Sequence, residues 1–169
     1  MMTRPTNPPG RPRRGGGTAP QTRDASSTMP PPRAVTVTNY RADPLYSRIV
    51  RATDAILKMG KVVRPIDVLV GMGLLTPAQL ADWYAGRTPY LERVIAGNLK
   101  RLSRLLRILR FHAHELKLMP SFTAYRRHGS RAALRFTKTG DANLEKVYAT
   151  HFIWPGKQPF HERAENDST

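Results

Sequence analysis

Residues 89–118 read PYLERVIAGNLKRLSRLLRILRFHAHELKL, and this stretch determines most of what the sequence predicts. Its apolar side chains recur at alternating steps of three and four residues, the spacing that places them on one face of an α-helix. Thr88-Pro89 is typical of a helix start, with threonine as the cap and proline at the first position. Together with the pattern it predicts a helix of about 30 residues from Pro89 to Leu118. The stripe consists of Leu91, Ile95, Asn98, Leu102, Leu105, Leu109, His112 and Leu116.

Two members of this stripe are polar. A single asparagine in an apolar seam can set the register of paired helices. Asn98 is therefore either a register residue, in a homodimer through the Leu91–Leu116 helix, or a residue at the edge of the stripe. His112 is interpreted as a hydrogen-bonded core histidine, because His112 and Glu115 are too few ligands for a metal site. No metal ion and no other cofactor is expected.

Positive charge is concentrated in the same part of the chain. The sequence of 169 residues carries a formal net charge of +16, and residues 93–138 hold twelve basic side chains and one acidic side chain. Like charges on a helix repel one another unless an external anion offsets the repulsion. The sequence therefore predicts a non-enzymatic nucleic-acid-binding protein. The residues expected to contact phosphate are Arg93, Lys100, Arg101, Arg104, Arg107, Arg110, Arg126, Arg127, Arg131, Arg135 and Lys138.

The nature of the partner leaves alternatives open. Duplex DNA is slightly favoured over RNA, and the face through Lys100, Arg104 and Arg107 is the preferred phosphate surface, because these residues lie near one line on a helix. Arginine also populates ordinary solvated surfaces. A helix of this kind also pairs with itself or with an acidic partner, so an interaction or oligomerisation protein is the alternative function.

The residues before this stretch predict three shorter helices and one short strand. Each helix opens on a proline at the first helical position. Gln79 lies three residues after Thr76, as in a capping box, and Gly86 is placed to close that helix. The strand is expected at residues 61–63, where two valines follow a lysine. The predicted helices cover residues 43–59, 65–72 and 76–85.

After Pro120 the helical period gives way to alternation. Residues 122–127 and 133–138 predict a β-hairpin with a basic tip, in which Tyr125 and Phe136 either stack on bases or pack against the helices. The fold class is mainly α with a small β-hairpin (α+β). A further short helix is expected after Asp141, through Thr150.

The order of these elements over residues 43–138 resembles a winged-helix unit. It runs helix, short strand, two capped helices and a basic hairpin, and the resemblance implies a duplex-DNA-binding surface. One feature departs from that pattern, because a helix of about 30 residues is long for a recognition helix.

The two ends of the chain are poor in apolar residues. Residues 1–34 contain eight prolines and four glycines and carry a net charge of +5, so a disordered basic arm is expected before a domain at residues 35–153. Residues 154–169 are expected to form an irregular tail.

The sequence argues against several other classes of protein. It has no cysteine, no P-loop and no dinucleotide-binding motif, and its acidic residues are scattered, so an enzyme is not favoured. No apolar run approaches the roughly 20 residues that cross a bilayer, so no membrane partner is expected. A cytoplasmic protein is expected, nucleoid-associated if it binds DNA. Beside His112, the remaining candidate for a functional histidine is His151, which lies among aromatic residues.

Overall fold

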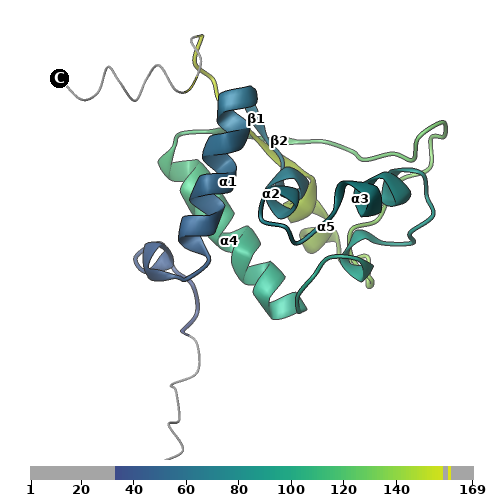
Figure 1. Cartoon of the computed structure of the whole chain (residues 1–169), viewed down its shortest axis with the longest axis horizontal. Coiled ribbons are helices and arrows are strands. Elements are labelled where there is room, and N and C mark those ends of the chain that lie inside the picture. The colour runs from purple at the N-terminus through teal and green to yellow at the C-terminus, as the bar shows by residue number, and fades with distance from the viewer. Residues whose placement is uncertain (1–32, 158–159, 161–169) are drawn as a thin grey trace, which may run out of the picture. The chain divides into compact units, whose positions relative to one another are not determined.

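The computed structural model describes residues 33–157 and 160, and Figure 1 shows their arrangement. These residues form a mixed α+β fold of five α-helices and a three-stranded antiparallel sheet. The helices are α1 (Tyr46–Met59), α2 (Pro65–Gly71), α3 (Pro77–Tyr84), α4 (Leu99–Glu115) and α5 (Ala142–Ala149). The strands are β1 (Val62–Val63), β2 (Met119–Phe122) and β3 (Thr150–Ile153), and the two 3₁₀ turns are η1 (Tyr40–Ala42) and η2 (Leu91–Arg93). Most of the disordered arm and most of the irregular tail expected at the two ends lie outside the described residues, which include 33–34 and, of the tail, 154–157 and 160.

Capping signals in the sequence predicted two of the short helices correctly. The Thr76 hydroxyl accepts a hydrogen bond from the backbone N–H of Gln79 over 3.2 Å, and the Gln79 side chain accepts one from the backbone N–H of Thr76 over 2.9 Å. Gly86, with a φ of 74°, follows the end of α3 as expected. Asp141 caps α5 by accepting a hydrogen bond from the backbone N–H of Leu144 over 2.9 Å.

Helix α1 begins at Tyr46, two residues after Pro44, the proline expected at its first position after a cap at Asp43. The Asp43 carboxylate accepts a hydrogen bond from the backbone N–H of Leu45 over 2.9 Å, which makes it part of a turn before the helix. The expected end of the helix at Gly60 is confirmed. The buried face of α1 packs against α2 and α4.

The helix predicted from Pro89 to Leu118 is wrong in its first third. Gly97 has a φ of 123°, a conformation that residues with a side chain rarely adopt, so the chain turns there. Asn98 then caps α4 by accepting a hydrogen bond from the backbone N–H of Arg101 over 2.8 Å. Helix α4 therefore has 17 residues. Asn98 is a helix cap and neither a register residue nor part of the apolar stripe.

The leucines of the stripe are used inside the protein. Leu102, Leu105 and Leu109 are buried in the core that α4 shares with α1 and the strands. A homodimer through a continuous Leu91–Leu116 helix would need both that helix and an exposed seam, and the described residues have neither.

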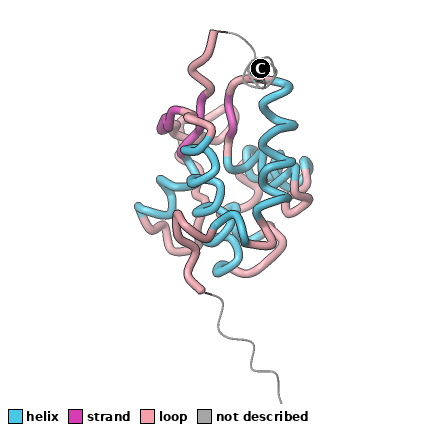
Figure 2. The backbone as a smooth tube through the Cα atoms, turned by 90° about the vertical axis from the view of Figure 1, so that its left-hand side faces the viewer, coloured by secondary structure: helices cyan, strands magenta, loops and turns pink. Residues whose placement is uncertain are grey.

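The sheet has the strand order β1-β3-β2, with β3 antiparallel to both neighbours. The hairpin predicted between residues 122–127 and 133–138 is present only in part, near its turn, and Phe122 of its first arm belongs to β2 and pairs with β3. A bridge between Arg126 and Ala133 joins the two arms, with backbone hydrogen bonds from the Leu134 N–H to the Tyr125 carbonyl over 3.0 Å and from the Arg127 N–H to the Ala132 carbonyl over 2.9 Å. Strand β3 was not predicted at all. In Figure 2 the strands gather at one end of the described residues, with most of the helices below them.

An aromatic cluster forms the other part of the core. The ring centroids of Trp83 and Tyr125 each lie 5.0 Å from that of Phe136 and lie 5.7 Å from each other. The Tyr148 ring stacks on the Phe136 ring with the centroids 5.2 Å apart. Tyr125 and Phe136 are buried in this cluster. Of the two interpretations of these rings, packing against the helices is therefore confirmed.

Candidate nucleic-acid interface

One side of α4 faces solvent. Five exposed side chains follow one another along it at steps of three and four residues, the spacing of neighbours on a helix surface. We call them the α4 stripe: Lys100, Ser103, Arg107, Arg110 and His114. The opposite side of the helix carries the buried leucines, so the core fixes which way the stripe points.

The three cations of the α4 stripe have no partner. Within the described part of the chain, Lys100, Arg107 and Arg110 make no hydrogen bond and no ion pair through their side chains. The stripe contains no acidic residue, so these charges repel one another. A surface of this kind is available to an external anion, and phosphate accepts strong hydrogen bonds from arginine and lysine.

Arg104 is engaged inside the protein instead. Its Nε donates a hydrogen bond to Oδ2 of Asp43, whose side chain is only 3% exposed, whereas the Arg104 side chain is 35% exposed. The guanidinium therefore neutralises a buried carboxylate. Of the face expected through Lys100, Arg104 and Arg107, the structure leaves Lys100 and Arg107 without a partner, and Arg110 continues the row one turn beyond Arg107.

Arg93, which precedes α4, and Arg101, in its first turn, lie outside the α4 stripe. Arg93 is exposed in η2. Arg101 is half-buried in the first turn of α4, where its Cδ lies 3.7 Å from the position that a Cβ on Gly97 would take. Neither residue belongs to the α4 stripe.

The basic residues of the loop between β2 and α5 lie in a separate area. In Figure 1 this loop projects at the right, beyond α3, whereas α4 runs through the lower left of the described residues. The Arg126 side chain donates to the Arg131 carbonyl over 2.7 Å, and the Arg135 side chain donates to the Lys138 carbonyl over 2.6 Å. The side chains of Arg131 and Lys138 are exposed. The structure therefore separates the predicted contact residues into two areas.

The tip of this loop is docked on the end of α3. The His128 ring stacks on the Tyr84 ring with the centroids 4.8 Å apart and the planes 3° from parallel, and the backbone N–H of His128 donates to the Tyr84 carbonyl over 2.8 Å. The Arg127 side chain crosses Gly86, where a Cβ would lie 2.6 Å from its Nε. No sequence pattern links these residues, because they are more than forty positions apart.

Both ring nitrogens of His151 are occupied. Nε2 lies 2.7 Å from the Tyr125 hydroxyl and Nδ1 lies 3.2 Å from the Thr123 hydroxyl. Burial lowers the pKa of His151, and the nearby Arg64 guanidinium lowers it further. The neutral ring thus ties β3 to the loop that follows β2.

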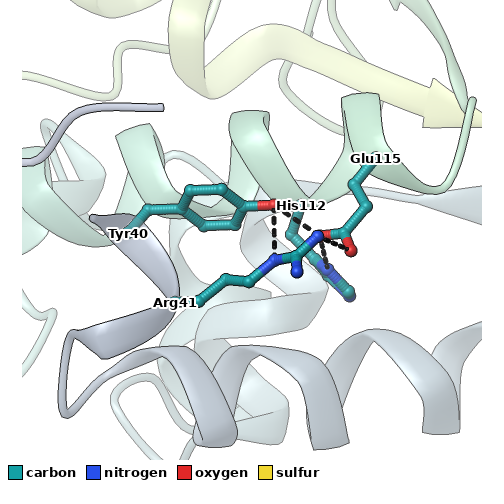
Figure 3. Close-up of polar contacts among 4 residues, drawn as sticks. All are labelled: Tyr40, Arg41, His112 and Glu115. Carbon is teal, nitrogen blue, oxygen red and sulfur yellow. Dashed lines mark hydrogen bonds and ion pairs between the residues drawn. The ribbon is translucent and has the colours of Figure 1, made fainter. Parts of the chain in front are cut away.

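A polar cluster joins η1 to the end of α4 (Figure 3). The Tyr40 hydroxyl and the Arg41 guanidinium both donate to the Glu115 carboxylate. The hydrogen bond from Tyr40 contributes most to lowering the pKa of Glu115, and the positive charge of Arg41 lowers it as well. The carboxylate is therefore held in its charged form, and its charge is matched within the cluster.

His112 lies beside this cluster and is 4% exposed. Its ring meets the Tyr46 ring edge-on at 5.5 Å. Its Nδ1 is 3.8 Å from Oε2 of Glu115, too far for a hydrogen bond, and neither ring nitrogen has a hydrogen-bond partner in the described part of the chain. The expected core position of His112 is confirmed, and the expected hydrogen bond is absent.

Protonation of His112 should destabilise the fold. Burial lowers the pKa of His112 below its ordinary value of 6.5, so the unfolded chain binds the proton more tightly. Stability is then full above about pH 6.5 and is lost as the pH falls towards the folded-state pKa. The slope that one histidine adds is at most about 1.4 kcal/mol per pH unit.

Urea unfolding of the wild type and of His112→Leu between about pH 7.5 and 5.5 measures this effect. The wild-type free energy of unfolding should fall across this range, and the decline should be shallower in the variant. Some decline should remain, because the pKa of His151 is also lowered. Parallel declines in the two proteins would exclude His112 as a source of the acid sensitivity.

Two further findings concern residues 33–157 and 160 as a whole. No three His, Asp or Glu side chains among them lie close enough together to hold a metal ion. No helix among them is both long and apolar enough to cross a membrane.

Comparison with protein-family models, with curated proteins and with solved structures finds no match to this chain.

Proposed function

We propose that this chain is a non-enzymatic nucleic-acid-binding protein that contacts backbone phosphates through the α4 stripe. One observation carries the proposal: Lys100, Arg107 and Arg110 share an exposed helix side, with no acidic residue in the stripe and no partner among the described residues. Side chains that neutralise phosphates release condensed counterions, and this release drives binding. The net charge of +16 adds long-range attraction for a polyanion.

Duplex DNA is the preferred partner. The major groove of B-DNA admits an α-helix, whereas the major groove of duplex RNA is deep and narrow. The 17 residues of α4 make a rod about 25 Å long with the stripe along its exposed side. Ser103 and His114 in the stripe offer polar atoms to base edges, between the cations that would hold the phosphates. A protein of this kind would be cytoplasmic and associated with the nucleoid.

A winged-helix arrangement is compatible with the order of the elements. α1, β1 and α2 come first, α4 leads directly into β2, and the last strand lies between the other two. In such a unit the helix before the second strand is the one that enters the groove, and here that helix is α4. Two insertions depart from the pattern: α3 and η2 stand between α2 and α4, and a long loop with α5 stands between β2 and β3.

A salt series tests the proposal. Fluorescence anisotropy of a labelled duplex of about 20 base pairs is measured at salt concentrations from about 50 to 300 mM. Three proteins are compared: the wild type, the α4 variant Lys100→Gln/Arg107→Gln/Arg110→Gln and the loop variant Arg126→Gln/Arg127→Gln/Arg131→Gln. The two variants lose the same charge, so a difference between them reports location and not net charge.

The α4 variant should bind far more weakly, and the slope of log K against log salt should become shallower by up to about 2.7, or about 0.9 per lost phosphate contact. The loop variant should retain most of the wild-type slope. Equal losses in the two variants would mean that only net charge matters. No binding of the wild type near physiological salt would overturn the proposal, and tighter binding of duplex RNA would overturn the preference for DNA.

A further inference from the structure

A groove of about 1080 Å³ lies along the second half of α4, which lines it from Leu106 to Glu115. Its walls come from the second half of α4, the segment that leads into η1, the inner face of β2 and β3, and α5. This volume is slightly above the roughly 300–1,000 Å³ that is usual for sites of small organic molecules. It is separate from the proposed DNA contacts except at Arg110 and His114, which lie on its rim.

The floor of the groove is aliphatic. Leu106, Leu109, Leu118 and Phe152 lie at its base, each at most 7% exposed, and the more exposed apolar lining comes from Val37, Phe111, Pro120 and Val147. None of these side chains offers a hydrogen-bond donor or acceptor. An alkyl chain gains free energy from contact with the exposed part of this apolar lining.

The mouth of the groove is positive. Arg110 and His114 lie one turn apart on α4, and Lys146 faces the groove from α5. The side chains of Arg110 and Lys146 make no ion pair or hydrogen bond with any described residue. Glu115 also lines the groove, but its charge is matched by Arg41. The groove therefore joins an apolar floor to cations that have no counter-charge.

We propose that this groove binds a single-chain amphipathic anion: the alkyl chain lies over the leucines and the anionic head lies between Arg110 and Lys146. The occupant is an alkyl anion because the cations at the mouth select a negative head and the floor selects a tail without polar groups. An alkyl cation would place its charge among like charges, and a neutral polar molecule would gain nothing from the floor.

Isothermal titration calorimetry of the full chain with decanoate tests the site, with decyltrimethylammonium as the cation of matched chain length. Decanoate should bind saturably with one molecule per chain, and decyltrimethylammonium should not bind. Across hexanoate, octanoate and decanoate the affinity should rise by about fourfold for each methylene group that enters the groove. Equal binding of the cation would show a merely apolar surface and would overturn the proposal, as would no binding of decanoate.

Two exposed positions allow substitutions that spare the core. Val37 lines the groove and is 69% exposed, so Val37→Glu adds a negative charge at the site, and Met59→Glu adds the same charge at a residue that is 91% exposed and outside this groove. Lys146→Met removes the charge at the mouth and keeps an apolar stem, and Lys58→Met is its control on α1.

Val37→Glu and Lys146→Met should each weaken decanoate binding by about fivefold to tenfold, and the two controls should match the wild type. Uniform affinity across all four variants would place decanoate elsewhere and refute the site. Neither Val37 nor Lys146 belongs to the α4 stripe. Both groove variants should therefore bind DNA as their controls do, and a failure of this site is distinguishable from a failure of DNA binding.

Discussion

Replacing Trp83 by alanine should lower the free energy of unfolding by about 3–5 kcal/mol. The Trp83 ring is fully buried and contacts the rings of Tyr84, Tyr125 and Phe136 at centroid distances of 5.0 to 5.7 Å. Its indole N–H donates to the Arg135 carbonyl over 2.8 Å, which joins α3 to the segment before α5. Because whole domains are stable by about 5–15 kcal/mol, this single change removes a large share of the total.

Urea unfolding followed by circular dichroism measures the change, with Trp83→Phe as the companion variant. Phenylalanine retains an aromatic ring and removes the indole N–H, so it should cost clearly less than alanine, about 1–2 kcal/mol. The Arg135 carbonyl also accepts the Leu91 N–H and so does not lose its last partner. An alanine variant as stable as the wild type would show that the aromatic cluster does not hold this part of the fold.

Replacing Arg104 by alanine should cost about 2–3 kcal/mol of unfolding free energy, although Arg104 lies on a helix among solvent-facing arginines. The change leaves the buried Asp43 carboxylate without its cation, and an unpaired buried charge is strongly destabilising. The estimate lies below the usual range for buried pairs because the Arg104 side chain is 35% exposed. Asp43 also keeps its hydrogen bond from the Leu45 N–H.

Arg107→Ala is the matched control, because it removes the same group from the next turn of α4 at an exposed position. It should change stability by less than about 0.5 kcal/mol and should weaken DNA binding. Adding Asp43→Asn to Arg104→Ala removes the buried charge and should restore part of the lost stability. If Arg104→Ala and Arg107→Ala unfold alike, the ion pair with Asp43 does not contribute to the fold.

Local signals explain what the sequence predicted well. The capping box at Thr76 and Gln79, the cap at Asp141 and the stop at Gly60 each involve residues within four positions of one another. The same locality explains the error at residues 89–98. Asn98 fits an apolar stripe by its spacing and fits a helix cap by its side chain, and it is the turn at the preceding Gly97 that makes it a cap.

Contacts between distant residues explain what the sequence left out. Asp43 and Arg104 are 61 positions apart, so no pattern showed that this arginine would be engaged. Strand β3 has four residues and directly follows α5, and only its pairing with β1 and β2 distinguishes it from the end of a helix. The cationic helix itself was predicted, but which cations remain free was decided by tertiary packing.

The position of β3 in the middle of the sheet has a consequence for the order in which the protein is made. β1 and β2 leave the ribosome first, yet they do not pair with each other, and each must wait for residues 150–153. Until then neither strand has its pairing partner, and the groove along α4 lacks the lining that β3 provides. The sheet therefore forms only after Thr150–Ile153 has been made, and a nascent chain stalled before Thr150 would present unpaired strand edges to chaperones and proteases.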